Sequence, residues 1–205
     1  SSMTRQVKYL AGVVKALTLF AGTAALVWPS PASADLKSKL LSGKIVSASI
    51  PGSGVWPGRA MGVVHASAEE TYRVLADLTK YNEFIPQIAG ARRLNKRAYE
   101  LRAKFPWPVN ETKVKLDVQQ GQRGAVYVIK WKMLSGSLKR YEGAAWIQPW
   151  GANRCLVTYQ MLAVPRIPAP NAVMTHGLRT AAAAVIGAVR KRVTVHTASR
   201  QPTNG

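Results

Sequence analysis

Cysteine is almost absent from this sequence, which has only Cys155 among its 205 residues. A single cysteine cannot form an internal disulfide, so the stability of the fold has to come from apolar packing. Cys155 lies in an alternating apolar pattern that is typical of a strand. We therefore expect it to be a small buried side chain and not a catalytic thiol.

Groups that carry catalysis or bind metals are also scarce. The three histidines, His65, His176 and His196, lie apart in the sequence, and none is paired with a neighbouring carboxylate. The sequence has no cluster with metal-ligand spacing, no nucleophile elbow and no phosphate-binding loop. We predict no catalytic residue, no metal and no cofactor. An acid or base role for His176 is the alternative, because it borders a run of small residues and could face a cavity.

Acidic residues are few, with nine against 29 lysines and arginines, and the formal net charge is +20. Residues 163–205 contain no acid, and their basic residues include Arg190, Lys191 and Arg192. A basic face of this kind attracts phosphate groups, as in nucleic acid or anionic lipid. Because the N-terminus predicts export, we expect contact with an anionic membrane surface and no nucleic acid. Charge that only keeps the protein soluble is the alternative.

A hydrophobic run of about 20 residues, long enough to span a bilayer as a helix, is missing near the N-terminus. Ala16–Trp28 is uncharged and apolar but shorter than that, and Lys15 interrupts any longer run. Small residues and prolines follow, with Ala32 and Ala34 spaced as signal peptidase accepts them. We predict a secretory leader cleaved after Ala34, with an uncleaved membrane anchor as the alternative.

The predicted leader divides the chain into three parts. Residues 1–34 comprise a tag remnant, Ser1–Met3, and the signal peptide. Residues 35–196 form one domain, and residues 197–205 form a polar disordered tail. A domain of this length can bury one substantial core. We expect a monomer that works in the periplasm or outside the cell.

Alternation of apolar and polar residues is abundant, and it is the pattern of half-buried antiparallel strands. A short helix at residues 35–41 and strands at residues 44–50 and 59–64 are predicted first. A helix is then expected to begin at Ser67, because Ser67 and Glu70 form a capping-box pair. Five strands are predicted after it, at residues 97–105, 113–118, 125–133, 139–147 and 154–163. The sheet is therefore expected to have one apolar face and one polar face.

Three acids lie within these predicted strands, namely Glu100, Asp117 and Glu142. Each is isolated from other groups that could share catalysis with it. We expect them on the solvent face, as partners for the surplus of lysine and arginine.

A long helix is predicted from residue 171 to about residue 193, after Pro168 and Pro170. Its apolar positions recur every three or four residues, at Met174, Leu178, Ala181, Val185 and Val189. Such a helix needs an apolar surface to lie on. The apolar face of a curved antiparallel sheet is the available one.

The order of these elements resembles the helix-grip fold of the START-like superfamily, which includes polyketide cyclases, coenzyme Q-binding proteins and lipid-transfer domains. Residues 62–78 (GVVHASAEETYRVLADL) and 81–86 (YNEFIP) are similar to the superfamily's entry segment. The resemblance covers residues 44–193 and implies an α+β fold, in which a curved antiparallel sheet wraps around a long C-terminal α-helix. It does not imply one activity, because the superfamily includes carriers, cyclases, hydroxylase domains and regulators. The paired histidine and cysteine ligands of its iron–sulfur branch are absent, so an oxygenase is set aside.

A bent sheet around one helix leaves a cavity where the facing side chains are small, and such cavities accept apolar ligands. The last helix has several small residues, including Gly177, Ala181 and Ala184, which leave either room for a ligand or close packing on the sheet. Predicted ligand-binding residues come from the apolar faces of sheet and helix: Tyr99, Leu101, Leu116, Tyr127, Ile129, Trp131, Tyr141, Tyr159, Met161, Met174, Leu178, Ala181 and Val185. Ordinary core packing is the alternative for the aromatic members.

Two proline-stiffened segments resemble gates. One carries Phe105 and Trp107 between two strands, and the other carries Ile167 before the last helix. Such tips dip into a bilayer interface or fold over a cavity as a lid. Stiff turns with a purely structural role are the alternative.

These observations together predict an exported carrier or sensor. Its ligand is expected to be a hydrophobic small molecule such as a lipid, a quinone or a sterol. One alternative is a cyclase or dehydrase-type enzyme that uses the same cavity. Another is a cationic envelope protein that binds membrane or protein by its surface.

Overall fold

The computed structural model describes residues 32–104 and 111–198. The chain divides into two units, residues 1–37 and residues 38–205. Helix α2 (Ala32–Leu41) matches the short helix predicted at residues 35–41 and begins before the predicted cleavage position. Apart from residues 32–34, the predicted leader lies outside the described residues. The predicted tail lies there too, except for residues 197 and 198, which are helical.

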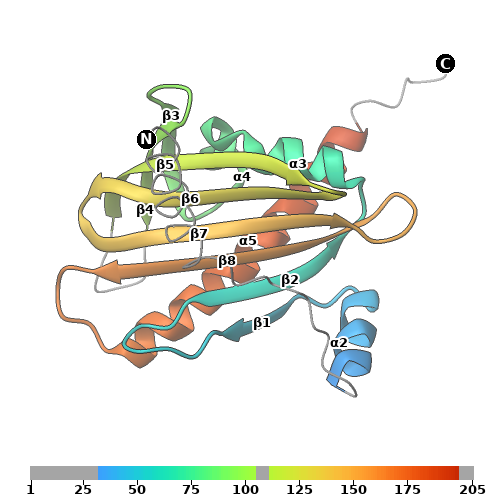
Figure 1. Ribbon diagram of the computed structural model, residues 1–205, viewed down its shortest axis with the longest axis horizontal. Helices are drawn as coiled ribbons and strands as arrows, with labels where there is room; N and C mark the ends of the chain where they lie inside the picture. The colour runs from blue at the N-terminus through green and yellow to red at the C-terminus, as the bar shows by residue number, and fades with distance from the viewer. Residues whose placement is uncertain (1–31, 105–110, 199–205) are drawn as a thin grey trace, which may run out of the picture. The chain divides into compact units, whose positions relative to one another are not determined.

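The second unit is built on one eight-stranded sheet with the order β1-β2-β8-β7-β6-β5-β4-β3 (Figure 1). Every neighbouring pair is antiparallel. The strands are β1 (Val46–Ser49), β2 (Gly58–Val64), β3 (Ile88–Arg93), β4 (Ala98–Lys104), β5 (Glu111–Arg123), β6 (Val126–Gly136), β7 (Leu138–Pro149) and β8 (Cys155–Pro165). The predicted α+β helix-grip architecture is confirmed.

Strand β3 is the element that the sequence analysis missed. It contains small residues and two consecutive arginines, and it has no clean apolar–polar alternation. Its pairing with β4 is also irregular, with a register shift between Ile88 and Gly90. As the last strand of the sheet, β3 pairs on one side only, so its sequence need not alternate strictly between apolar and polar residues.

Helix α5 (Asn171–Ala198) is the long C-terminal helix, and it runs behind the strands in the view of Figure 1. It packs on β2, β8 and β1 and also contacts α3. Within the described residues, its stretch Asn171–Thr194 is long and apolar enough to cross a membrane. Leu178, Ile186 and Val189 are nevertheless almost fully buried, which is typical of the core helix of a globular domain.

Helix α3 (Ala68–Ala76) begins where the capping box predicted. Ser67 Oγ accepts a hydrogen bond from the Glu70 amide at 3.2 Å, and the Ser67 amide donates to Glu70 Oε2 at 3.1 Å. The short helices η1 (Leu78–Lys80) and α4 (Tyr81–Phe84) follow directly. This helical segment connects β2 to β3 at the far edge of the sheet.

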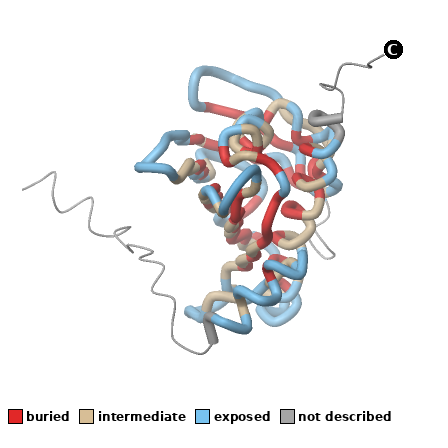
Figure 2. Tube along the Cα trace, turned by 90° about the vertical axis from the view of Figure 1, so that its right-hand side faces the viewer, coloured by how far each residue is buried: buried red, intermediate tan, exposed pale blue. Residues whose placement is uncertain are grey.

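The core of this unit lies between the sheet and α5, where Figure 2 shows the buried parts of the trace. The predicted alternation is visible in β5 and β6, because Val114, Leu116 and Ile129 are buried while Lys115 and Lys130 are exposed. One face of the sheet therefore supplies apolar side chains to the core. The other supplies charge to the surface.

Cys155 is fully buried in this core. Its thiol donates a weak hydrogen bond to Thr71 Oγ1 at 3.2 Å. Burial raises the pKa of the Cys155 thiol to about 11. The thiol is therefore protonated at neutral pH, which agrees with a packing role.

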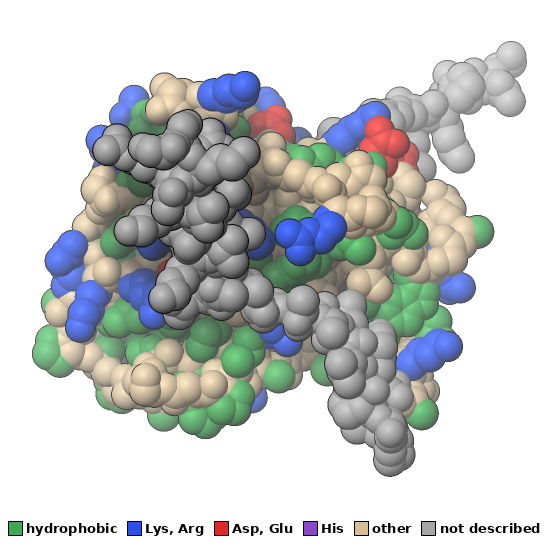
Figure 3. Space-filling model, viewed as in Figure 1, with side chains coloured by type: hydrophobic (Ala, Val, Ile, Leu, Met, Phe, Trp, Pro, Cys, Tyr) green, Lys and Arg blue, Asp and Glu red, His purple; other side chains and the backbone are tan. Residues whose placement is uncertain are grey.

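The outer face carries the charge surplus, and Figure 3 shows lysine and arginine side chains spread over it with few acidic ones. The strand acids pair as predicted, with Asp117 bound to Arg97 at 2.6 Å and Glu142 bound to Arg140. Glu100 differs from the prediction because it is only 7 % exposed. Arg92 and Lys113 cover it, with N–O distances of 2.8 and 3.4 Å. Arg92 is the main reason that the pKa of Glu100 is lowered.

Candidate functional site: an apolar cavity beneath the last helix

A cavity of about 320 Å³ lies between the sheet and the N-terminal part of α5. Its walls come from three places: the apolar faces of β4 to β8, the cavity-facing side of α5, and the segment from η1 to β3. The volume is at the lower end of the range of roughly 300–1,000 Å³ that small-molecule pockets occupy. The space therefore suits one small molecule.

The structure brings all but two of the predicted ligand-binding residues to this cavity. Those that line it are Leu101, Leu116, Ile129, Trp131, Tyr141, Tyr159, Met161, Met174, Leu178, Ala181 and Val185. Tyr99 and Tyr127 do not line it. The strand and helix periodicities therefore predicted the inner face, while the binding of a ligand by these residues stays a prediction.

Tyr99 and Tyr127 point to the inner face but lie elsewhere along their strands. The Tyr127 ring stacks on Tyr72 of α3, with the ring centroids 4.6 Å apart. Tyr99 is buried, and the Arg93 guanidinium lies 5.8 Å from the centroid of its ring. Alternation in a strand indicates which face a side chain takes, but it does not indicate which neighbour covers that part of the face.

Sequence reasoning missed the part of the wall that comes from the connection between α3 and β3. This part comprises Leu78, Tyr81, Ile85, Gln87 and Ile88. Tyr81, Ile85 and Leu78 are buried, although their segment was predicted only as the end of a helix. The available signal was the run of large apolar residues in YNEFIP, which is unusual for a solvent-exposed connection.

Further residues line the cavity besides the predicted ligand-binding set. They are Ala103, Lys104, Val173, His176, Gly177 and Thr180. His176 does face the cavity, as its neighbours had suggested, but it is exposed. Its Nδ1 lies 3.2 Å from an Arg179 nitrogen, and no carboxylate is bonded to it within the described residues.

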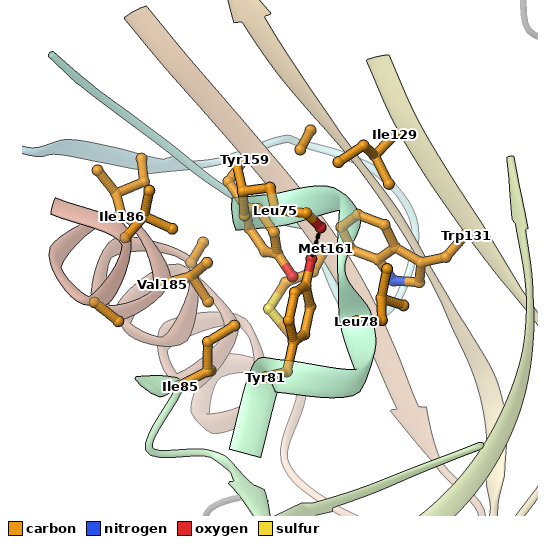
Figure 4. Packing of buried hydrophobic residues seen from close by; sticks show 14 of the residues in the cluster. Leu75, Leu78, Tyr81, Ile85, Ile129, Trp131, Tyr159, Met161, Val185 and Ile186 are labelled. Atoms are coloured by element: carbon orange, nitrogen blue, oxygen red, sulfur yellow. Dashed lines mark hydrogen bonds between the residues drawn. The ribbon is translucent and has the colours of Figure 1, made fainter. Parts of the chain in front are cut away.

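Three buried tyrosines line the apolar cavity, and Figure 4 shows two of them, Tyr81 and Tyr159, directed into the same space. Tyr81 donates a hydrogen bond to the Leu75 carbonyl at 2.5 Å. Burial raises the pKa of Tyr141 to about 12, and it raises the pKa values of Tyr81 and Tyr159 further. All three phenols are therefore neutral hydrogen-bonding groups at physiological pH.

Trp131 is the largest side chain in the wall, and a glycine on the adjacent strand makes room for it. Trp131 of β6 pairs with Gly143 of β7. A Cβ atom on Gly143 would lie 2.2 Å from Cζ2 of the indole. The indole also meets the Tyr159 ring of β8, the strand beyond β7, with the centroids 5.2 Å apart. The indole is thus packed against residues of two strands on the same side of β6.

The cavity wall is nearly free of charge. Among the described residues that line it there is no carboxylate, and the two basic residues, Lys104 and His176, are both exposed. A buried ion without a partner would carry a large desolvation penalty. The interior therefore suits a neutral, apolar molecule.

The predicted anionic-surface residues do not form one shared surface. Arg190 is partly buried and donates to the carbonyl oxygens of Val63 and Gly43, each at 2.8 Å. Arg192 pairs with Glu83 and is partly buried, while Lys191 is exposed. Arg190 and Arg192 thus bind neighbouring segments of the domain.

The predicted gate residues are separated by the structure. Phe105 and Trp107 lie outside the described residues. Ile167 lies between β8 and α5, where it is 49 % exposed and does not line the cavity. Its role as a gate or as a membrane contact stays a prediction.

Residues 64–190 match the family described as polyketide cyclase / dehydrase and lipid transport. No curated protein matches this sequence.

Comparison with solved structures identifies the same architecture in several proteins. A START superfamily protein from Mycobacterium smegmatis is 17 % identical, with a TM-score of 0.61 and coverage of 75 % of this chain and 99 % of that chain. A STAR-related lipid transfer protein from Xanthomonas axonopodis is 18 % identical, with a TM-score of 0.62 and coverage of 74 % and 93 %. The Zhui aromatase/cyclase from a Streptomyces species is 14 % identical, with a TM-score of 0.56 and coverage of 79 % and 99 %. At these identities the likeness shows a shared fold.

Proposed function

We propose that this chain, which belongs to the polyketide cyclase / dehydrase and lipid transport family, is a carrier or sensor of a hydrophobic small molecule. The observation that supports this most strongly is the cavity beneath α5. It measures about 320 Å³, and its interior wall is apolar apart from neutral phenol, indole and amide groups. Transfer of an apolar ligand from water into such a space is favourable, because its surface is removed from water.

A carrier or sensor accounts for the cavity better than an enzyme does. An enzyme would need a proton-handling group held within hydrogen-bond reach of the substrate. Among the described lining residues, His176 is the one imidazole, and it is exposed beside Arg179. The deeper phenols have raised pKa values, so they are poor bases at neutral pH. The wall can orient a ligand more readily than it can transform one.

Export is the second part of the proposal, and it rests on the N-terminal sequence. The short apolar run Ala16–Trp28 and the small residues up to Ala34 are typical of a cleaved leader. Edman sequencing of material secreted by a Gram-negative host should begin at Asp35. Full-length protein retained in the inner membrane would contradict cleavage.

The ligand proposal is tested by recovering what the protein binds. The purified chain should be extracted with organic solvent and analysed by mass spectrometry, and the extracted protein should then be titrated with N-phenylnaphthylamine, a neutral apolar fluorophore. We expect an apolar compound in the extract and saturable binding of one fluorophore per chain. The absence of both an extracted compound and saturable binding would contradict the proposal. Conversion of the recovered compound on re-addition would favour the enzyme instead.

A further inference from the structure

Two polar atoms in the cavity wall have no hydrogen-bond partner, the acceptor Gln87 Oε1 and the donor Trp131 Nε1. The indole Nε1 of Trp131 is buried and makes no hydrogen bond, and the whole residue is only 7 % exposed. Buried indole N–H groups usually find an acceptor, because an unpaired donor loses its hydration without compensation. Trp131 lines the cavity, so a molecule in the cavity can supply the missing acceptor.

The position of this N–H group is fixed by the packing of the indole. Gly143 lies against the ring, and any Cβ atom there would come within 2.6 Å of Cε2, the carbon bonded to Nε1. Tyr159 packs on the indole at a centroid distance of 5.2 Å. In Figure 4 the indole nitrogen points toward Leu78, which is another residue of the cavity wall. The donor is therefore held in place before any ligand binds.

Tyr141 is the polar side chain that lies near this donor. Burial raises the pKa of the Tyr141 phenol, and a side-chain hydrogen-bonding interaction with Trp131 lowers it. The indole Nε1 nevertheless has no hydrogen bond of normal geometry to it. A ligand oxygen at this place would accept a hydrogen bond from the indole N–H.

We propose that the ligand is a neutral, mainly apolar molecule with a carbonyl-type oxygen that accepts a hydrogen bond from Trp131 Nε1. The inference rests on the proposed function, because it assumes that a small molecule occupies the cavity. A ketone, ester or quinone oxygen fits the site, since each is a neutral acceptor. A plain hydrocarbon would leave the indole donor unpaired. A carboxylate would find no buried cation among the described lining residues.

A matched pair of probes isolates this hydrogen bond. The probes are 2-acetylnaphthalene and 2-isopropylnaphthalene, which have similar shapes and differ in the carbonyl oxygen. The ratio of their affinities should be measured for the wild-type chain and for Trp131→Phe. We expect the preference for the ketone to fall about tenfold in Trp131→Phe, as the loss of one buried hydrogen bond predicts. The ratio cancels the change in cavity volume that both probes experience.

Trp146→Phe is the matched control. Trp146 lies on β7 between Ala145 and Ile147, so it points to the opposite face of the sheet and does not line the cavity. Its replacement should leave the ratio unchanged. An equal ratio in wild type and Trp131→Phe would overturn the inference while the proposed function stands. Failure of both probes to bind the wild type would contradict the proposed function itself.

A second measurement applies even if Trp131→Phe does not fold. The infrared carbonyl stretch of 2-acetylnaphthalene bound to the wild-type chain should shift to lower frequency than in hexane, because a hydrogen bond weakens the C=O bond. A stretch equal to the hexane value would overturn the inference.

Discussion

One side of helix α5 packs closely on the sheet, and another side faces the cavity. The adjacent residues Ala182 and Ala181 lie on these two sides. Ala182 is fully buried in the close contact with the sheet. Ala181 is only partly buried and lines the cavity. On the close side, a Cβ atom on Gly58 of β2 would lie 2.3 Å from the Leu178 carbonyl carbon. The helix backbone is therefore in close contact with β2, while a cavity separates the N-terminal part of the helix from β6 and β7.

The difference shows that a small residue on a helix can either allow close packing or leave a cavity. Opposite β2, Gly58 lets the strand reach the helix backbone at Leu178 and Arg179 and leaves no space. Opposite β6 and β7, the facing side of α5 carries Gly177 and Ala181, and the space between helix and sheet stays open. What the partner strand presents decides between contact and cavity.

The strongest effect that we expect is a loss of stability in alkali. It arises from the buried tyrosines that line the cavity. Tyr141 has a pKa raised by burial from the ordinary 10 to about 12, and the pKa values of Tyr81 and Tyr159 are raised further. The fold therefore favours the neutral phenols, and this contribution is fully present below pH 10. Above pH 10 the unfolded chain loses these protons first. Stability should fall by roughly 1.4 kcal/mol per pH unit for each buried tyrosine.

Absorbance at 295 nm and circular dichroism, recorded together from pH 9 to 13, check this prediction. We expect the buried tyrosines to ionise only as the protein unfolds, so that the two signals change together. Complete ionisation of all tyrosines near pH 10 with the fold intact would show that water reaches the cavity phenols freely.

The next effect concerns the close contact between α5 and β2. There, Gly58→Ala should destabilise the fold by about 3 kcal/mol or more. The added Cβ atom would lie within 2.5 Å of three backbone atoms of α5, and a helix backbone cannot move aside as a side chain can. Urea unfolding followed by circular dichroism measures the loss.

Gly121→Ala is the control for this substitution. Gly121 is exposed on β5, and a Cβ atom there would meet nothing within 4 Å. Its replacement should change stability by less than about 0.5 kcal/mol. Equal stability of Gly58→Ala and Gly121→Ala would mean that α5 and β2 are not in close contact.

The sequence predicted most of the architecture because the governing patterns are local. Alternation placed Leu116, Ile129 and Trp131 on the inner face, and the Ser67–Glu70 pair marked the start of α3. Strand β3 was missed because an edge strand with a bulge need not alternate.

The candidate site was less predictable, because its limits depend on contacts between distant segments. Nothing local in β6 indicates that Tyr72 covers Tyr127 while Trp131 faces the cavity. The same applies to Arg190, whose charge predicted a surface role but whose guanidinium binds the Val63 and Gly43 carbonyls. The charge and the sequence periodicity of a residue indicate which face of its helix or strand it lies on. The residues that it contacts in the folded protein decide its role.

The affinity of N-phenylnaphthylamine for Ala181→Trp decides whether the cavity is the binding site. Ala184→Trp is the matched control, because it adds the same bulk one turn further along α5 at a position that does not line the cavity. If the cavity is the binding site, Ala181→Trp weakens binding of the fluorophore at least about tenfold and lowers the free energy of unfolding by less than about 1 kcal/mol. Ala184→Trp leaves the affinity for the fluorophore unchanged. If the space is close-packed core, Ala181→Trp loses about 1–3 kcal/mol of stability and keeps the wild-type affinity. That second result would contradict the account.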